Sequence, residues 1–582
     1  MKKLFLAYEV LSPRSRKRFF WVLGVSTIGM AFEVMGIGLV MPLIDLLVRP
    51  ESAEELPLWK ALLSYLGGGT NILLLGLACI VGLFATKNLF LAYQVNLHSK
   101  YSFGVQVETS TYLFENYLAR PYEFFLKTNT SELLRNAVGE VNSFVGYVLQ
   151  PFLVIITECL VLFAIIGLLI YVEPRASLLA IVFIGGLGWT FHRLTKRRVA
   201  DWGNERQRRE GVKIKCLQEG FTGIKAIKLL NDPSFWSESF REHAQLGAVA
   251  GRKQYAMQQM PRLLLETLAI LGLAVLTLGL VSVGEDRNAS LPKLGMIAFG
   301  LLRVMPSVAR IVHSCQSVVY GWPCVKVLKE EIGDWESLPR NPKENSKCSF
   351  SEAFVMDNIS FAYSQGSGNS LVNATIEVHQ GSSVGIIGES GSVKSTLVDI
   401  ALGLLQFDEG ALWVDGKKIG DEVSQSSWQK MVGYVPQEIY LTDDTLRSNV
   451  AFGDDPEKVD DERVWQCLED ASLHEFVKEL PLELNTMMGE RGTRLSGGQR
   501  QRVGIARALY RDPSFIVFDE ATSSLDSETE QSVMQTVRDL QKTKTFLIVA
   551  HRLSTLKNCD VIYKIKDGQV VASGSFDEMA EV

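Results

Sequence analysis

The stretch Ser-Val-Gly-Ile-Ile at 383–387, followed by Gly388-Glu-Ser-Gly-Ser-Val-Lys-Ser-Thr396, decides the fold of the C-terminal part of this chain. Residues 383–387 predict a buried strand, and 397–405 predict an apolar helix after the loop. A glycine-rich loop between a strand and a helix is typical of a phosphate-binding loop, whose backbone N–H groups and helix N-terminus bind phosphate oxygens. Lys394 adds a cation, and the hydroxyl of Ser395 can bind Mg²⁺. The residues expected to hold a nucleotide here are Gly388, Ser390, Gly391, Ser392, Val393, Lys394, Ser395 and Thr396.

One residue departs from the pattern, because Val393 stands where the motif has glycine before the lysine. Glycine permits positive φ and a close approach of the backbone to phosphate, whereas valine is branched and stiff at χ1. If the position needs the conformation of glycine, nucleotide binding suffers. If Val393 lies at the helix start, the defect is mild. The sequence leaves both possibilities open.

Two acidic residues follow a second apolar strand, Phe-Ile-Val-Phe-Asp519-Glu520 at 515–520. In α/β domains the chemistry lies at the carboxyl ends of the strands. Asp519 suits Mg²⁺, directly or through water. Glu520 suits a general base that orients water in line with the γ-phosphate.

A third element, Leu495-Ser-Gly-Gly-Gln499, opens a helix through 501–510. Polar and glycine residues at a helix N-terminus bind phosphate oxygens, which makes Ser496, Gly497, Gly498 and Gln499 candidate ligands. Two phosphate-binding elements about a hundred residues apart are most simply explained by a nucleotide held between two subunits.

Composition excludes several classes of protein. The 582 residues carry a net charge of −6, with 47% hydrophobic residues, so intrinsic disorder is excluded. The 8 cysteines are scattered and predict neither a disulfide framework nor a metal site. A mildly acidic chain gives no reason to expect a nucleic-acid partner.

The N-terminal part contains apolar runs long enough to cross a bilayer, which takes about 20 residues. We expect a helical transmembrane domain at 1–335, a turn-rich linker at 336–350 and the nucleotide domain at 351–582. Basic residues gather between the fourth and fifth spans, so the N-terminus, both long loops and the nucleotide domain should be cytoplasmic. The loops at 97–143 and 196–258 should continue the spans as helices. The six expected spans are 19–47, 71–96, 144–171, 176–195, 259–283 and 293–317.

Several ionisable residues lie inside these spans, and a charge at mid-bilayer costs about 2.5–3.5 kcal/mol. They either pair between helices or line a polar path for an anionic substrate. The cations that could hold a phosphate there are Lys87, Arg303 and Arg310, and the acids are Glu33, Glu158 and Glu266. A short amphipathic helix at 56–66 either caps the bundle or contacts a lipid tail.

With these motifs in order, the region 351–582 resembles the nucleotide-binding domain of ATP-binding-cassette transporters. The resemblance implies that Tyr363 stacks on adenine, that Gln437 contacts Mg²⁺ and that His551 contacts the γ-phosphate. It also assigns Gly489-Glu-Arg-Gly492 to the segment before the signature and Ser523-Ser-Leu-Asp526 to the D-loop, so that Asp526 joins the nucleotide site.

Six spans before one such domain resemble an exporter half-transporter. This implies ATP and Mg²⁺ as cofactors and a second subunit, most simply in a homodimer. Each ATP would then lie between the 388–396 loop of one subunit and the 495–499 signature of the other. Segments 128–138 and 220–230 resemble coupling helices, with an ordinary solvated helix as the alternative.

The membrane part resembles bacterial lipid-linked oligosaccharide flippases, through Glu33-x-x-Gly36-x-Gly38, Lys87-Asn88, Pro261-Arg262 and the 303–310 segment. That resemblance implies a polyprenyl-pyrophosphate-linked glycan moved to the outer leaflet of a bacterial inner membrane. Three alternatives stay open: an exporter of peptides, drugs or ordinary lipids; a weakly active half that needs a separate partner; and an ATP-gated channel or regulator.

Overall fold

The computed structural model of this chain describes residues 2–38, 69–172, 174–283, 287–333, 335, 349–363, 370–389, 393–520 and 527–580. Inside some helices only the backbone is described, as at 69–77, 174–184, 275–283 and 287–303. The chain divides into two compact units, one of Met1–Arg120 with Lys127–Leu338 and one of Pro121–Leu126 with Pro339–Val582. This division falls inside the linker predicted at 336–350. The amphipathic helix expected at 56–66 lies outside the described residues.

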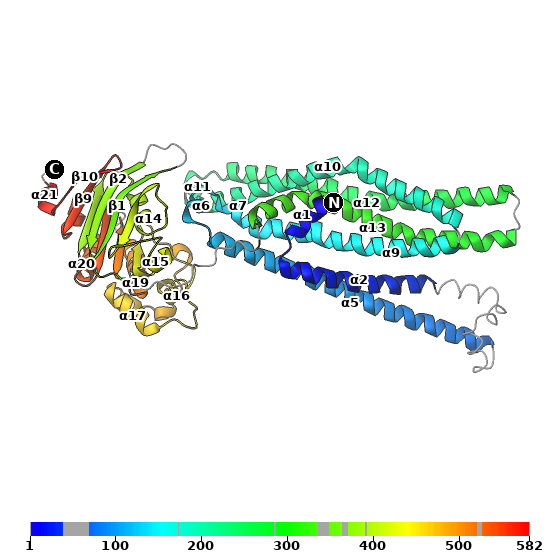
Figure 1. The fold of residues 1–582 in the computed structure, drawn as a ribbon, viewed down its shortest axis with the longest axis horizontal. Helices are drawn as coiled ribbons and strands as arrows, with labels where there is room; N and C mark the ends of the chain where they lie inside the picture. Colours follow the sequence, from blue (N-terminus) through cyan, green and yellow to red (C-terminus); the bar gives the residue numbers. More distant parts are fainter. Residues whose placement is uncertain are drawn as a thin grey trace. The chain divides into compact units, whose positions relative to one another are not determined.

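The first unit is built from helices (Figure 1). Each of the six expected spans falls on helical chain, although the last part of the first, 39–47, is outside the described residues. The helices are α1 (Lys2–Glu9), α2 (Pro13–Gly38), α5 (Gly69–Leu118), α6 (Tyr122–Lys127, most of which belongs to the second unit), α7 (Thr130–Leu134), η2 (Arg135–Glu140), α8 (Val141–Phe144), η3 (Val145–Leu149), α9 (Gln150–Val172), α10 (Pro174–Thr222), α11 (Ile224–Leu230), α12 (Ser234–Val283) and α13 (Arg287–Ile332).

Four of these helices are far longer than a bilayer requires. α5 and α12 have 50 residues each, which is about 75 Å at 1.5 Å per residue against a hydrocarbon core of about 30 Å. Because α5 continues to Leu118 and α10 to Thr222, the expected helical extension of the spans is present. Among the residues whose side chains are described, Pro13–Met35 and Thr130–Gly167 are long and apolar enough to cross a membrane.

Helices α9, α10, α12 and α13 lie side by side in this unit (Figure 1). A buried aliphatic cluster joins α9 to α13 through Val161, Ile165, Val304 and Val308. Farther along, α10 and α13 approach so closely that a Cβ on Gly203 would lie 2.3 Å from the carbonyl oxygen of Tyr320. A larger residue at position 203 would therefore push these two helices apart.

The second unit contains two β-sheets (Figure 1). An antiparallel sheet has the order β2-β1-β4-β5, and a six-stranded sheet has the order β10-β9-β3-β8-β7-β6. In the larger sheet β9, β3, β8, β7 and β6 are parallel neighbours, and only β10 is antiparallel. The strands are β1 (Ala353–Ala362), β2 (Ser370–His379), β3 (Ser383–Gly388), β4 (Glu409–Val414), β5 (Lys417–Lys418), β6 (Val432–Val435), β7 (Phe515–Asp519), β8 (Thr545–Ala550), β9 (Val561–Lys566) and β10 (Gln569–Gly574).

Helices and two apolar cores complete this unit. Every residue of β8 is buried, as expected for a central parallel strand covered on both faces. One core cluster covers each face of the large sheet, and together they bring Phe515, Val517, Ile516 and Phe518 of β7 out of water. The helices are α14 (Lys394–Ala401), α15 (Gln425–Met431), α16 (Leu446–Val450), α17 (Asp461–Asp470), α18 (His474–Lys478), α19 (Gly497–Tyr510), α20 (Ser527–Gln541) and α21 (Phe576–Ala580), with short turns η4 (Glu483–Asn485), η5 (Glu490–Gly492) and η6 (Leu553–Leu556). The predicted α/β P-loop fold is confirmed.

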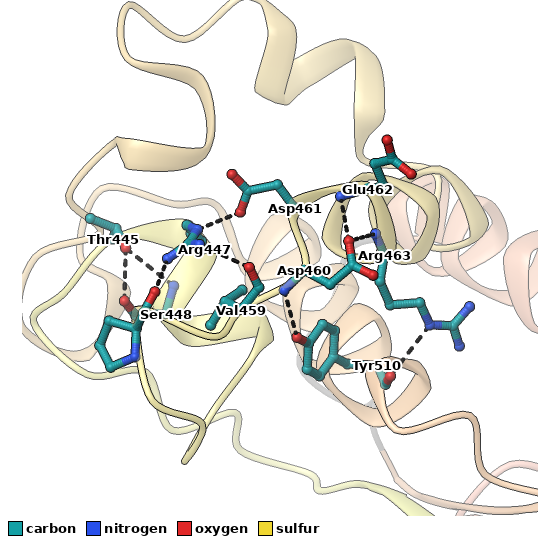
Figure 2. A network of polar contacts seen from close by, with 10 residues as sticks. Thr445, Arg447, Ser448, Val459, Asp460, Asp461, Glu462, Arg463 and Tyr510 are labelled. Atoms are coloured by element: carbon teal, nitrogen blue, oxygen red, sulfur yellow. Dashed lines mark hydrogen bonds and ion pairs between the residues drawn. The ribbon is translucent and has the colours of Figure 1, made fainter.

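A polar network ties α19 to α16 and α17 (Figure 2). Arg447 on α16 pairs with Asp461 and donates to the carbonyl of Val459 at 3.0 Å. Asp460 caps α17, and its N–H donates to the hydroxyl of Tyr510 at 3.3 Å. Since Tyr510 ends α19, this network fixes the helix that begins at Ser496.

The stability of this unit should depend on Trp428, which is fully buried. Its ring stacks on Phe354 with 4.7 Å between centroids, and its indole N–H donates to the carbonyl of Ala401 at 2.8 Å. We expect Trp428→Ala to cost about 3–5 kcal/mol, which lowers the Tm of a domain of this size by about 10 °C.

The matched variant Trp428→Phe keeps a ring against Phe354 but removes the five-membered ring of the indole and its hydrogen bond, so we expect a smaller loss of about 1–3 kcal/mol. Scanning calorimetry of the full chain in detergent measures both shifts. Equal shifts in the two variants would contradict the account, because the ring stack would then add nothing.

Candidate nucleotide site

The ends of four neighbouring strands bring the predicted residues together. β3 and β8 pair in register as Ile387 with Ala550, and β7 pairs with β8 as Asp519 with Val549. The residues that follow these strands therefore emerge at one edge of the sheet. Four side chains meet there, one after each strand: Lys394 after β3, Glu520 after β7, His551 after β8 and Gln437 after β6.

Lys394 is held in place by the loop that precedes it. It opens α14, is 5% exposed, and its ammonium donates to the carbonyl oxygens of Gly388 at 2.8 Å and Glu389 at 3.1 Å. Burial lowers its pKa, and the nearby carboxylate of Glu520 opposes that shift. A buried ammonium anchored by carbonyls is a fixed cation at the place where the sequence expects phosphate.

Glu520 is oriented from both sides. Its Oε1 lies 2.8 Å from Nε2 of His551 and 3.6 Å from Nζ of Lys394, and its Oε2 accepts from the amide of Gln437 at 3.2 Å. Its φ is 44°, in the left-handed region that only a constrained glutamate adopts. Strained backbone of this kind is typical of functional residues. A carboxylate fixed in this way can accept a proton from a water molecule placed beside it.

Asp519 lies deeper, at the end of β7. The hydroxyl of Tyr434 on β6 donates to its Oδ2 at 3.4 Å. Burial, and then the charge of Glu520, raise the pKa of Asp519. The carboxyl of Asp399 on α14 is close enough that burial and the charge of Asp519 raise its pKa to about 6.

Val393 combines the two possibilities that the sequence leaves open. It lies at the N-cap of α14, and it also has the conformation of a glycine, with φ 55° and ψ 13°. Its side chain is 7% exposed and packs in the core beside Leu397. A left-handed conformation costs an L-residue about 1–2 kcal/mol, and it is a genuine outlier for a β-branched one. Val393, the residue that departs from the motif, therefore has a strained backbone.

The signature element is a well-made helix start. Ser496 caps α19 by accepting from the N–H of Gln499 at 3.2 Å, and the side chain of Gln499 accepts from the N–H of Ser496 at 2.8 Å. Gly497 and Gly498 form the first turn. Over the described part of the chain, these residues bond one another and not the cluster around Lys394.

The other predicted residues divide into two groups. The hydroxyl of Tyr363 lies 3.1 Å from that of Thr396, and Ser395 is exposed at the start of α14. Both are therefore beside the loop, although the stacking role of Tyr363 stays a prediction. Ser390, Gly391, Ser392 and Asp526 lie outside the described residues.

These residues fit ATP with Mg²⁺. The buried ammonium of Lys394 and the N-terminus of α14 suit phosphate, and the oxygens of Ser395, Gln437 and Asp519 suit a hard cation. Among the described residues no three His, Cys, Asp or Glu side chains form a metal cluster.

Tyr434, Asp399 and Tyr122 of the second unit were not identified from the sequence. Burial and the charges of Asp399 and Tyr363 raise the pKa of Tyr122, which belongs to the segment Pro121–Leu126 grouped with this unit. The sequence places the first coupling segment later, at 128–138. An acidic residue among the apolar residues of the second half of α14 is a signal that could have identified Asp399.

In the helical unit, two of the three predicted cations form ion pairs. Lys87 on α5 lies 3.4 Å from Glu33 on α2, and both side chains are nearly buried. Arg310 on α13 binds Glu158 on α9 through two contacts of 2.7 and 3.2 Å, with 51% of its side chain exposed. The side chain of Arg303 lies outside the described residues.

The chain is similar to known proteins over most of its length. Residues 371–523 match the family described as ABC transporter. An ATP-dependent lipid A-core flippase of Cupriavidus metallidurans is 29% identical over 518 residues, which cover 87% of this chain and 84% of the relative. The ATP-dependent lipid A-core flippase of Burkholderia thailandensis is 29% identical over 81% of this chain and 78% of its own length.

A solved structure supports the fold. A bacterial Atm1-family ABC exporter with ATP bound matches with a TM-score of 0.78 and 21% identity, over 97% of this chain and 96% of that one. The similarity includes both the helical and the α/β part.

Removing the charge of Glu520 tests its role. We expect Glu520→Gln to lower ATP turnover at least 100-fold (about 2.7 kcal/mol) while ATP binding is kept, because the amide fills the same place but accepts no proton. Glu438→Gln, which removes an exposed charge next to Gln437, is the matched control and should turn over normally. Phosphate release measures both, and normal turnover by Glu520→Gln would exclude it as the base.

The strain at Val393 predicts the order of affinity in a short series. We expect ATP to bind about 3- to 10-fold more tightly to Val393→Gly, because about 1 kcal/mol of backbone strain is removed. Val393→Ala, which keeps Cβ without the branch, should fall between the two. Titration calorimetry in the Glu520→Gln background measures the affinities. Tightest binding by the native valine would contradict the strain argument.

Proposed function

We infer that this chain, an ABC half-transporter with a helical domain and one ATPase domain, is an ATP-driven flippase for an anionic glycolipid. The observation that carries the ATPase part is the cluster of Lys394, Glu520 and His551 at the strand ends. The similarity to two lipid A-core flippases over more than four fifths of the chain supports lipid as the substrate class.

The residues divide the work of hydrolysis. Lys394 and the N-terminus of α14 would bind phosphate oxygens, and Ser395, Gln437 and Asp519 would hold Mg²⁺. His551 and Gln437 fix the carboxylate of Glu520, which takes a proton from the attacking water. ATP, when bound, supplies the phosphoanhydride whose hydrolysis drives the cycle.

We further propose that two copies of this chain form a homodimer. Ser496 and its glycines face no part of the Lys394 cluster among the described residues, yet a capped helix start of this kind suits phosphate. A second copy supplies the missing half, with the signature of one subunit completing the P-loop site of the other.

The substrate should carry phosphate on its headgroup. Arg310 is bidentate to Glu158 yet half exposed, so its free edge can bind a second anion. Lys87, in contrast, is nearly enclosed with Glu33 and serves as an interhelical pair. Of the predicted cations, Arg310 is thus the better candidate for the substrate path, with Arg303 as a neighbour on α13.

Two substrates share this chemistry, a phosphorylated lipid A-core and a polyprenyl-pyrophosphate-linked oligosaccharide. Purified protein in vesicles, given ATP and a fluorescent form of each lipid in turn, should move at least one of them to the opposite leaflet. Access of the label to an impermeant quencher measures that movement. Movement of neither lipid, with ATP turnover intact, would contradict the glycolipid proposal.

A double substitution separates pairing from substrate binding at Arg310. Glu158→Gln/Arg310→Gln removes both charges together, so no buried charge is left unpaired. We expect lipid movement to fall at least fivefold (about 1 kcal/mol), with basal ATP turnover within about twofold, since the ATPase residues are untouched. Glu33→Gln/Lys87→Met is the matched control and should keep its lipid movement. Equal losses in both double variants would show that the pairs only hold helices together.

A further inference from the structure

An apolar cavity of about 750 Å³ lies beside the N-terminal helix, and it is separate from the nucleotide site and from the ion pairs of the spans. It is bounded by α1, by the start of α2 and by the segment from α8 to α9. Its walls are mainly aromatic and aliphatic, and they include Phe5, Leu11, Phe19, Phe144, Val148 and Phe152.

The cavity is unlike an ordinary gap in a protein core. It is partly open at the surface and has the size of a ligand pocket. Part of its wall is rigid, because the rings of Phe19 and Phe152 stack at 6.1 Å. An open pocket with apolar walls can accept an apolar guest.

A cation lies beside two residues of the cavity wall. The guanidinium of Arg16 donates to the carbonyl oxygens of Tyr8 at 3.2 Å and Glu9 at 2.9 Å, and it lies 5.1 Å from the centre of the Tyr8 ring. Tyr8 and Glu9 both line the cavity. These contacts hold Arg16 in place without neutralising it, and among the described residues no carboxylate forms an ion pair with it.

The single acidic residue in the wall is already neutralised. The carboxylate of Glu9 pairs with Lys329 at 3.3 Å, and its carbonyl also accepts from the indole of Trp335 at 3.3 Å. The exposed side chains of Arg14, Lys17 and Arg18 extend the positive charge along the first turns of α2. The wall of the cavity is therefore mainly apolar, and the first turns of α2 beside it carry four cations, with the carboxylate of Glu108 held by the hydroxyl of Ser15.

The surroundings decide what can fill the cavity. α2 is one of the helices long and apolar enough to cross a membrane, and it starts at Pro13 with these cations. Basic residues at the start of a span favour the cytoplasmic side, where they attract anionic lipids. The hydrocarbon available to an apolar cavity at that level is a lipid tail.

We propose that this cavity binds one anionic phospholipid of the cytoplasmic leaflet, with an acyl chain inside and the phosphate at Arg16. The lipid is a bound component of the helical domain and not the transported substrate. It fastens α1 to α2 and α9 by filling the space between them.

The test uses the full-length protein in phosphatidylethanolamine vesicles with two photoactivatable probes. Phosphatidylglycerol and phosphatidylcholine carry the same diazirine on one acyl chain, and labelled peptides are mapped by mass spectrometry. We expect labelling of the peptides that contain Phe19 and Phe152, at least fivefold stronger with phosphatidylglycerol. Labelling of these peptides no stronger than that of other apolar helices, or equal for both probes, would overturn the proposal.

Two matched pairs of variants locate the tail and the headgroup. Ala7→Trp fills the cavity and should lower the labelling at least fivefold, whereas Ala31→Trp, at an exposed position on α2, should not. Arg16→Gln should bring the ratio of the two probes close to one, whereas Lys17→Gln should leave it mostly unchanged.

Arg16→Lys tests whether Arg16 acts through its charge or only through its contacts with the backbone. It keeps the charge but loses the forked donation to two carbonyls, so the preference for phosphatidylglycerol should be retained. Loss of the preference in Arg16→Lys, or unchanged labelling in Ala7→Trp, would show that the cavity does not hold an anionic lipid.

Discussion

The parallel pairing of β3, β8 and β7 is the constraint on which the nucleotide site depends. Ile387 pairs with Ala550, and Asp519 pairs with Val549 one residue earlier, so the residues that follow these strands emerge close together. The buried strands hold this register, because a slip of one residue would turn every side chain to the other face. The distances around Glu520 follow from this alignment.

The same edge of the sheet contains two residues with strained backbone. Glu520 and Val393 have φ of 44° and 55°, and both stand within the site that the ATP chemistry needs. At Glu520 the strain aims a carboxylate between His551 and Gln437. At Val393 the side chain is buried in the core, and we expect the valine to make the binding conformation of the loop harder to adopt.

The sequence could indicate which residues gather at the sheet edge, because they stand next to strand ends and helix starts. Motif spacing pointed to Lys394 and Glu520, and the family resemblance to His551, without knowledge of any long-range contact. The partners that come from facing positions were not predictable in this way. Tyr434 reaches Asp519 only because β6 pairs with β7, a pairing that leaves no mark in local spacing.

The helical domain shows the same limit in another form. The lengths of the helices follow from long runs without breakers, but the pairs do not: Glu33 and Lys87 are 54 residues apart, and Glu158 and Arg310 are 152 apart. The pairing of these charges depends on how each helix is rotated about its axis. The sequence does not define that rotation, because polar residues lie on several faces of each apolar helix. The cavity beside α1 is likewise formed by three segments and has no signature in the sequence.

The central claim is that the strand-end cluster is a working ATPase whose rate responds to a glycolipid. The most direct measurement is ATP turnover by the native protein in vesicles, with and without added lipid A-core or polyprenyl-pyrophosphate glycan, and with Glu520→Gln as the blank. The account predicts turnover above the blank and a further increase with at least one of these lipids. Turnover equal to the blank under every lipid condition would contradict it.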